Sequence, residues 1–199
     1  YEYFLLCELL STKNRKCRPL PVLNIGVACQ FRSYETVPVD SPEFQEYVQD
    51  ALDLIEFANG PVTSKWGKLR AEMGHPESFN LELLAIGNEQ WESKNVDVAP
   101  RYLAFEKAIH KVYPEIKCLG TAGPFVNHEL HTQAWDFYKS ECEKNPDFTY
   151  AVDEHYYVEP KWLYDNVDFY DNYPRNIGIF AGEYAGHDEN QKNSVEAAL

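Results

Sequence analysis

The sequence has 199 residues, of which 44% are hydrophobic and 25% are charged, and this composition excludes a disordered chain, a collagen-like repeat and a low-complexity segment. It contains no run of about 18 apolar residues, so no membrane-spanning segment is expected. With 18 basic and 32 acidic residues, the net charge of −14 disfavours binding to nucleic acid or to an acidic membrane, whereas a neutral substrate is compatible with it.

Residues 1–10 are predicted to form an amphipathic helix. They contain two Glu and no basic residue, so they do not form a signal peptide. The helix has no capping residue before it, and we therefore expect the chain to be the middle of a longer one. The five cysteines form no CxxC pair, which excludes a zinc ribbon and a thioredoxin-type site. Free thiols are expected, and a Cys7–Cys17 or Cys118–Cys142 bridge stays open.

Strand-like and helix-like segments alternate along the rest of the chain. Ser41 as N-cap and Pro42 in the first turn predict a strong helix start, and Gly60 after Asn59 predicts its end. A long polar connection follows over residues 61–80. The predicted strands are 20–26, 81–87, 116–122, 150–155 and 176–182, and the predicted helices after the first are 42–59, 99–113, 134–142 and 161–170.

This alternation predicts a parallel sheet with helices packed outside it. A doubly wound sheet would normally carry a glycine-rich nucleotide turn, and neither GxGxxG nor GxxxxGK[ST] is present. A (β/α)8 TIM barrel is therefore favoured. Five predicted units cannot close such a barrel, so we expect a partial one.

Two glutamates follow buried strands at the position where barrels place their chemistry. Glu89 comes after the segment Ile86-Gly87, and Glu183 comes after Gly182; each glycine is expected to let the chain turn sharply. A barrel of about 250 residues has about 31 residues per unit, so a separation of 94 residues corresponds to three units. Either glutamate alone could be an ordinary surface residue. Two carboxylates facing one another are what glycoside hydrolysis requires.

Several segments resemble the α-L-arabinofuranosidases of glycoside hydrolase family 51. They are YEYFLLCE, PLPVLNIGVACQ, the block from Gln49 to Trp91, AVDEHYYVEPKWL and FAGEYA. In the clan to which this family belongs, the acid/base follows barrel strand four and the nucleophile follows strand seven. The resemblance implies that residues 1–199 form a partial catalytic (β/α)8-barrel domain, about strands 3 to 7, without the remaining strands and the accessory β-sandwich.

The resemblance also implies site residues. Glu89 would be the general acid/base and Glu183 the nucleophile, and Asn88 would hydrogen-bond the sugar hydroxyl beside the anomeric carbon. Asn24 and Trp91 are assigned to substrate binding on the same basis. Neither a cofactor nor a metal is implied.

The His155-x-Tyr157 spacing places both side chains on one face of a strand. By the resemblance, His155 lines the pocket and Tyr157 hydrogen-bonds the nucleophile. Tyr156 is the competing assignment if the strand end is bulged, and a satisfied core histidine is the competing interpretation of His155.

Other polar groups carry weaker signals. His128 and His131 are one residue short of the HExxH spacing, which excludes a zincin, and a solvent-facing loop is expected there. Trp66, Arg70 and His75 could line the pocket or could fix the long connection in place, and both interpretations stay open.

The expected function is a retaining glycoside hydrolase that releases terminal α-L-arabinofuranosyl residues from arabinose-containing polysaccharides or oligosaccharides. The alternatives are a xylanase or endoglucanase-like barrel enzyme and an inactive truncated fragment that binds carbohydrate. Arabinofuranosyl-containing glycans are the expected partners, a homo-oligomer of the full-length protein is left open, and a secreted, extracellular location is favoured. Two departures from the family pattern are the basic stretch 11–18 and Glu92, which stands where a glycine is usual.

Overall fold

Five strands form one parallel sheet in the computed structural model, which describes residues 1–126 and 128–186. Consecutive strands are neighbours, in the order β1-β2-β3-β4-β5, and at least one helix separates each strand from the next along the chain. This is the connectivity of a (β/α)8 barrel, so the predicted fold class is confirmed as part of such a barrel. The strands are β1 (Val22–Leu23), β2 (Leu83–Ile86), β3 (Lys117–Thr121), β4 (Ala151–Val158) and β5 (Gly178–Gly186).

The helices agree with the predicted pattern except in the long polar connection. They are α1 (Glu2–Leu10), α2 (Pro42–Asn59), α3 (Lys65–Glu72), α4 (Val98–Val112), α5 (Glu129–Lys144) and α6 (Pro160–Asp165). Helix α3 was not predicted, because Gly67 in its first turn weakens its propensity; the Ser64 hydroxyl accepts a hydrogen bond from the Gly67 N–H and starts it. Helix α5 begins five residues before the predicted start, where the His128 side chain accepts from Leu130 N–H.

Helix α2 forms as its sequence predicts. The Ser41 hydroxyl accepts a 3.1 Å hydrogen bond from Phe44 N–H, and Pro42 occupies the first turn, where its missing N–H costs nothing. Phe44 and Ile55 are fully buried on the helix face that meets the sheet. The helix ends before Gly60, as expected.

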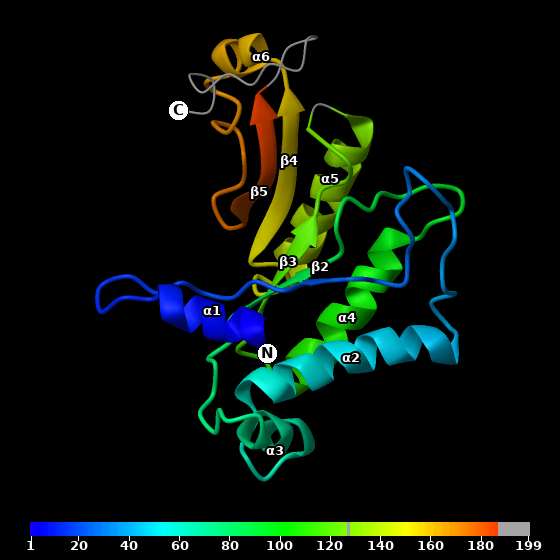
Figure 1. Cartoon of the computed structure of the whole chain (residues 1–199). Helices are drawn as coiled ribbons and strands as arrows, with labels where there is room; N and C mark the ends of the chain where they lie inside the picture. Colours follow the sequence, from blue (N-terminus) through cyan, green and yellow to red (C-terminus); the bar gives the residue numbers. More distant parts are fainter. Residues whose placement is uncertain (127, 187–199) are drawn as a thin grey trace.

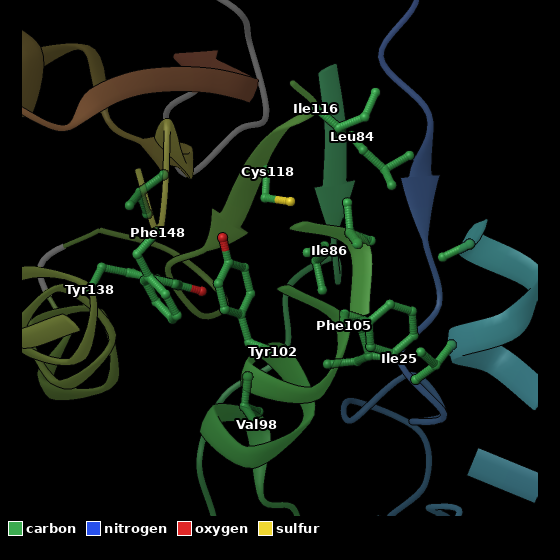
Figure 2. Close-up of a cluster of buried hydrophobic side chains, with 14 of the residues drawn as sticks. Ile25, Leu84, Ile86, Val98, Tyr102, Phe105, Ile116, Cys118, Tyr138 and Phe148 are labelled. Atoms are coloured by element: carbon green, nitrogen blue, oxygen red, sulfur yellow. The ribbon is translucent and has the colours of Figure 1, made fainter. Parts of the chain in front are cut away.

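The main core lies between the outer face of the sheet and helices α2, α4 and α5 (Figure 1). Figure 2 shows the side chains of β2 and β3 packed against Tyr102 and Phe105 of α4. Burying each large apolar side chain contributes about 1.5–3 kcal/mol. Close approach of α5 requires Gly120 in β3, because a Cβ there would lie 2.2 Å from the Tyr138 ring.

The inner face of the sheet is different. Small and medium apolar side chains, Ala85, Leu119 and Ala151, form a second cluster near the amino ends of the strands. A hollow of about 650 Å³ opens beside them at that end. Because side chains alternate along a strand, the residues nearer the carboxyl ends that share this face are Thr121 in β3 and Asp153, His155 and Tyr157 in β4. The polar residues of the inner face therefore gather at the carboxyl ends.

The five cysteines carry free thiols in the structure, so neither of the two bridges left open is formed. Burial raises the pKa of the Cys118 thiol to about 12, which makes it unreactive at neutral pH. Among the described residues, no helix combines the length and the apolar character needed to cross a bilayer.

Candidate active site

Glu89, His155 and Glu183 meet on the inner face of the sheet, beyond the carboxyl end of β2 and within the carboxyl halves of β4 and β5. One side-chain atom of each residue lies within 4.8 Å of the corresponding atoms of the other two. Glu89 follows β2, His155 lies in β4 and Glu183 lies in β5. The sheet thus joins two glutamates that stand 94 residues apart in the sequence, three strands from one another.

The backbone at Glu89 is held in an unusual conformation. Gly87 has φ +89° and Glu89 has φ +56°, in the left-handed region that non-glycine residues rarely adopt. Such a residue costs about 1–3 kcal/mol unless its surroundings fix it, and these positions cluster at functional sites. Here the Glu89 N–H donates to the Thr121 hydroxyl at 3.1 Å. Tyr138 in turn hydrogen-bonds both backbone groups of Thr121, so helix α5 supports the turn.

Glu183 reaches the site by another route than the predicted one. It lies inside β5 and not after its end, and Gly182 does not adopt a left-handed conformation, so the expected sharp turn is wrong. Asp153 pairs with Phe180 whereas His155 pairs with Glu183, so β5 has one extra residue opposite β4. This bulge reverses the alternation of β5 and brings Glu183 to the inner face, beside His155.

Strand β4 supplies the groups that hold the two carboxylates. His155 Nδ1 lies 2.8 Å from Glu89 Oε1 and 3.7 Å from Glu183 Oε2, and its Nε2 lies 3.3 Å from Asp153 Oδ2. The Tyr157 hydroxyl donates to Glu183 Oε2 at 2.6 Å. His155 is buried, but its partners are three acids, so it is not merely a satisfied core histidine.

Tyr156 is excluded as the partner of Glu183. Its side chain lies on the outer face of β4, where its hydroxyl contacts Glu154 and Tyr170. The bulge that could have favoured it lies on β5, and the alternation of β4 is unbroken. Between the two tyrosines, the geometry selects Tyr157.

The surrounding acidic side chains raise the pKa values of His155 and Tyr157. Burial lowers the pKa of His155, but hydrogen bonds to Asp153 and Glu89, together with the charges of Asp153 and Glu183, outweigh it and raise that pKa to about 9. The hydrogen bond to Glu183, followed by burial, raises the pKa of Tyr157 to about 12. At neutral pH, His155 is therefore an imidazolium that donates from both nitrogens, and Tyr157 is a neutral donor.

These three side chains could also surround a cation, because each offers one ligand atom. A histidine ligates metal through an unprotonated nitrogen. Since His155 is protonated at neutral pH, a cation would first have to displace the proton from Nδ1. In the resting cluster, His155 is accordingly a hydrogen-bond donor to the acidic side chains around it.

The remaining predicted residues lie next to Glu89. Asn24 and Asn88 line a hollow of about 310 Å³ together with Glu89. Asn24 Oδ1 also accepts from Gly26 N–H and Val27 N–H, which shapes the turn after β1. The exposed Asn88 side chain is free to meet a ligand.

Trp91 is held by its backbone. The Gln30 side-chain amide donates to the Trp91 C=O and accepts from the Trp91 N–H, both at 2.9 Å. The indole then packs edge-on against Phe31, which lines the same hollow, with ring centres 5.1 Å apart. Trp91 is thus a fixed aromatic side chain at the border of the site.

Arg70 and His75 lie outside the site, so their interpretation as a pocket wall is wrong. Arg70 is 1% exposed and donates to the carbonyl oxygens of Phe57, Gly60, His75 and Pro76. His75 stacks on Phe79, with its Nε2 2.9 Å from a carboxylate oxygen of Glu8. Both residues fix the long connection.

Two other polar residues have structural contacts. His131 is buried in α5 and bonds Glu154 at 2.8 Å, so the expectation of a solvent-facing loop is wrong for it. Its i, i+3 spacing from His128 reflects the first turn of a helix. Glu92 accepts from Val98 N–H and Ala99 N–H and thereby caps helix α4.

Sequence reasoning missed three residues that hold the site: Asp153, Thr121 and Gln30. Asp153 was detectable, since the same two-residue spacing that placed His155 and Tyr157 on one face includes it. Thr121 and Gln30 act through contacts with Glu89 and Trp91 that are remote in sequence, and no local pattern indicates them.

Comparison with known proteins gives consistent matches. A family described as the Alpha-L-arabinofuranosidase 1 domain matches residues 1–175. The whole chain is 40% identical to an extracellular exo-alpha-L-arabinofuranosidase of Streptomyces chartreusis and 32% identical to Alpha-L-arabinofuranosidase 2 of Arabidopsis thaliana, covering 22% and 26% of those proteins. It therefore spans about a quarter of their length.

Among solved structures, an arabinose-bound family 51 α-L-arabinofuranosidase is similar, with a TM-score of 0.60 and 27% identity over 82% of this chain and 24% of that one. A thermostable family 51 enzyme from Thermotoga petrophila has a TM-score of 0.53 at 17% identity, over 79% of this chain and 40% of that one, and supports the fold.

Proposed function

The chain belongs to the α-L-arabinofuranosidases of glycoside hydrolase family 51, and on that premise we propose that it carries the catalytic residues of a retaining exo-acting glycosidase. The substrate would be a terminal α-L-arabinofuranosyl residue on an arabinose-containing polysaccharide or oligosaccharide. The observation that carries the proposal is the meeting of Glu89 and Glu183, with side-chain oxygens within 4.8 Å. Retaining enzymes place the two carboxyl groups about 5–5.5 Å apart, and inverting enzymes need about 6.5–9.5 Å.

In the first step, the Glu183 carboxylate attacks the anomeric carbon and Glu89 gives its proton to the departing glycosidic oxygen. The bond from carbon to that oxygen breaks, and an ester between the sugar and Glu183 forms. In the second step, Glu89 takes a proton from water, and the resulting hydroxide attacks the same carbon and releases Glu183. Two inversions give net retention.

The neighbouring groups have matching tasks. Tyr157 donates to one oxygen of Glu183 at 2.6 Å, which orients the nucleophile and leaves its other oxygen for the sugar. His155 orients Glu89 through the 2.8 Å hydrogen bond. Asn88 would bind the hydroxyl beside the anomeric carbon, and Asn24 and Trp91 would contact the sugar residues around Glu89, consistent with their places beside the 310 Å³ hollow.

We further propose that residues 1–199 are the central part of the catalytic barrel, about strands 3 to 7. Under that assignment β2 is barrel strand four and β5 is strand seven, which agrees with the three-strand separation of the two glutamates. The rest of the barrel and an accessory β-sandwich would come from other parts of the protein. We also propose a secreted location, because the Streptomyces chartreusis relative is named as an extracellular enzyme.

The test is hydrolysis of 4-nitrophenyl α-L-arabinofuranoside by the full-length protein, with 4-nitrophenyl β-D-xylopyranoside and unsubstituted xylan as controls. We expect turnover of the arabinofuranoside alone, and NMR should show the α-anomer of arabinose as the first product. Preferred turnover of xylan would favour the xylanase-like alternative. A β-anomer as first product would refute the retaining mechanism, and no turnover would refute the enzyme function.

A further inference from the structure

Asp153 bonds His155, which contacts Glu89, and Gly182, which precedes Glu183. It bonds neither glutamate side chain itself. Its Oδ2 lies 3.3 Å from His155 Nε2, and its Oδ1 accepts from Gly182 N–H at 3.0 Å. The residue is 5% exposed and lies on the inner face of β4. We propose that Asp153 is a positioning residue that aligns Glu89, through His155, with Glu183, through Gly182. This inference rests on the proposed function and assigns a task within it.

The contact with Gly182 explains how the bulge in β5 is held. The extra residue of a bulge leaves the strand ladder locally unpaired, and Asp153 supplies the acceptor that the neighbouring strand does not. A Cβ on residue 182 would lie 2.4 Å from Asp153 Oδ1, so the carboxylate occupies the space that only glycine leaves open. Glu183 is the next residue, and its direction therefore depends on this contact.

The contact with His155 orients the imidazole toward Glu89. A ring nitrogen that bonds Asp153 fixes the rotation of the ring, and Nδ1 then faces Glu89 Oε1. The charged groups that face His155 are Asp153 from β4, Glu89 after β2 and Glu183 from β5. Together they keep the imidazole protonated, since its pKa is raised to about 9 despite burial. The Asp153 carboxylate thus helps to position both glutamates, Glu89 through His155 and Glu183 through Gly182.

Two substitutions in the full-length protein separate these contacts. In Asp153→Asn, Oδ1 still accepts from Gly182 N–H, but the amide nitrogen faces His155 and cannot accept from it. In Asp153→Ala both contacts are lost. The readout is kcat/KM for 4-nitrophenyl α-L-arabinofuranoside, whose leaving group needs little protonation, and for an arabinofuranoside with an alkyl alcohol leaving group, which needs the acid.

For Asp153→Asn we expect kcat/KM to fall by about 10- to 100-fold with the alkyl substrate and by less than about threefold with the 4-nitrophenyl substrate. For Asp153→Ala we expect a loss of about tenfold or more with both. Glu154→Gln is the matched control, because it changes the next residue of the same strand on the opposite face; it should lower thermal stability without changing the ratio of the two substrates. If Asp153→Asn lowers kcat/KM equally for the two substrates, or for neither, the inference is overturned.

A double-mutant cycle tests the bulge contact without any activity measurement. Gly182→Ala should lower Tm in the Asp153 protein, where the new methyl group meets the carboxylate. It should lower Tm much less in Asp153→Ala, where that carboxylate is absent. The same Tm decrease in both backgrounds would overturn the contact. If the wild type is inactive but Gly182→Ala still lowers Tm more in the Asp153 protein than in Asp153→Ala, the proposed function is refuted and the contact between Asp153 and Gly182 is not.

Discussion

Strand β4 carries an acidic cluster on each face, and the two clusters differ in how fully their carboxylates are bonded. On the outer face, the Glu154 side chain is fully buried, and one of its oxygens accepts from His131 at 2.8 Å, Trp135 at 2.6 Å and Tyr173 at 3.0 Å. Its other oxygen accepts from Tyr156 and Tyr170. On the inner face, the side chains of two other glutamates, Glu89 and Glu183, are 23% and 42% exposed, and one oxygen of each is bonded to a β4 side chain.

The difference distinguishes a structural acid from a candidate catalytic one. A carboxylate has about four acceptor sites, and those of Glu154 are taken by buried donors, so nothing remains for a ligand. Glu89 and Glu183 keep acceptor sites that face solvent. The two-residue period of β4 separates the two environments, since Glu154 and His155 are adjacent in sequence and point in opposite directions.

The largest effect should come from removing the proposed nucleophile. Glu183→Ala should reduce kcat by about 10⁴-fold or more, because no other group can form the covalent intermediate. Glu89→Ala is the matched comparison, and it should slow alkyl arabinofuranosides far more than the 4-nitrophenyl substrate. With added azide, Glu89→Ala should give the α-arabinofuranosyl azide and Glu183→Ala the β-azide, as NMR can establish. A Glu183→Ala rate within a few-fold of wild type would refute the nucleophile assignment.

On the outer face, Glu154→Ala should act on stability. It leaves the His131, Trp135 and tyrosine donors buried without an acceptor, so we expect a loss of about 3–5 kcal/mol in the free energy of unfolding. Denaturant unfolding measures this loss, and Glu154→Gln, which keeps an acceptor oxygen, should lose less. Activity per folded molecule should stay near that of wild type. A kcat that falls as steeply as in Glu183→Ala would contradict the separation of the two faces.

The inner cluster should also make stability depend on pH. The pKa of His155 is about 9 in the folded protein and about 6.5 in the unfolded chain, so the folded state binds more protons between these values. The stabilisation that His155 contributes is therefore complete below pH 6.5 and is lost as pH rises to 9, which lowers the free energy of unfolding by about 3 kcal/mol at most. Unfolding free energies measured across this range should show the decrease in wild type and lack it in His155→Gln. A variant that retains the full decrease would assign the effect to another group.

The smallest effect should come from a hydroxyl next to the proposed nucleophile. Tyr157→Phe removes the donor to Glu183 and should reduce kcat by about 10- to 100-fold with little change in stability. Tyr156→Phe removes the adjacent hydroxyl on the outer face, and it should lower stability while kcat stays within about twofold. Steady-state kinetics and thermal unfolding of the two variants give the comparison directly. The reverse pattern would mean that Tyr156 is the partner of Glu183.

Much of the barrel framework could be predicted because it depends on local signals. The start of α2 at Pro42 follows from Ser41 and the proline, and the alternation of apolar segments predicts the five parallel strands. Helix α3 was missed because its capping serine is followed by a glycine in the first turn. The environment of His131 was missed because burial of a polar residue depends on a partner, Glu154, that is 23 residues away.

The sequence by itself indicated the candidate residues for the chemistry, since a glutamate at a strand end and a two-residue spacing in β4 are local patterns. Only the tertiary structure decided how Glu183 is directed, which tyrosine it meets and what joins the two halves of the site. Those outcomes depend on one extra residue in β5 and on the contact between Asp153 and Gly182. A bulge is defined by the pairing of two strands, and a single sequence segment does not contain the register with its neighbour.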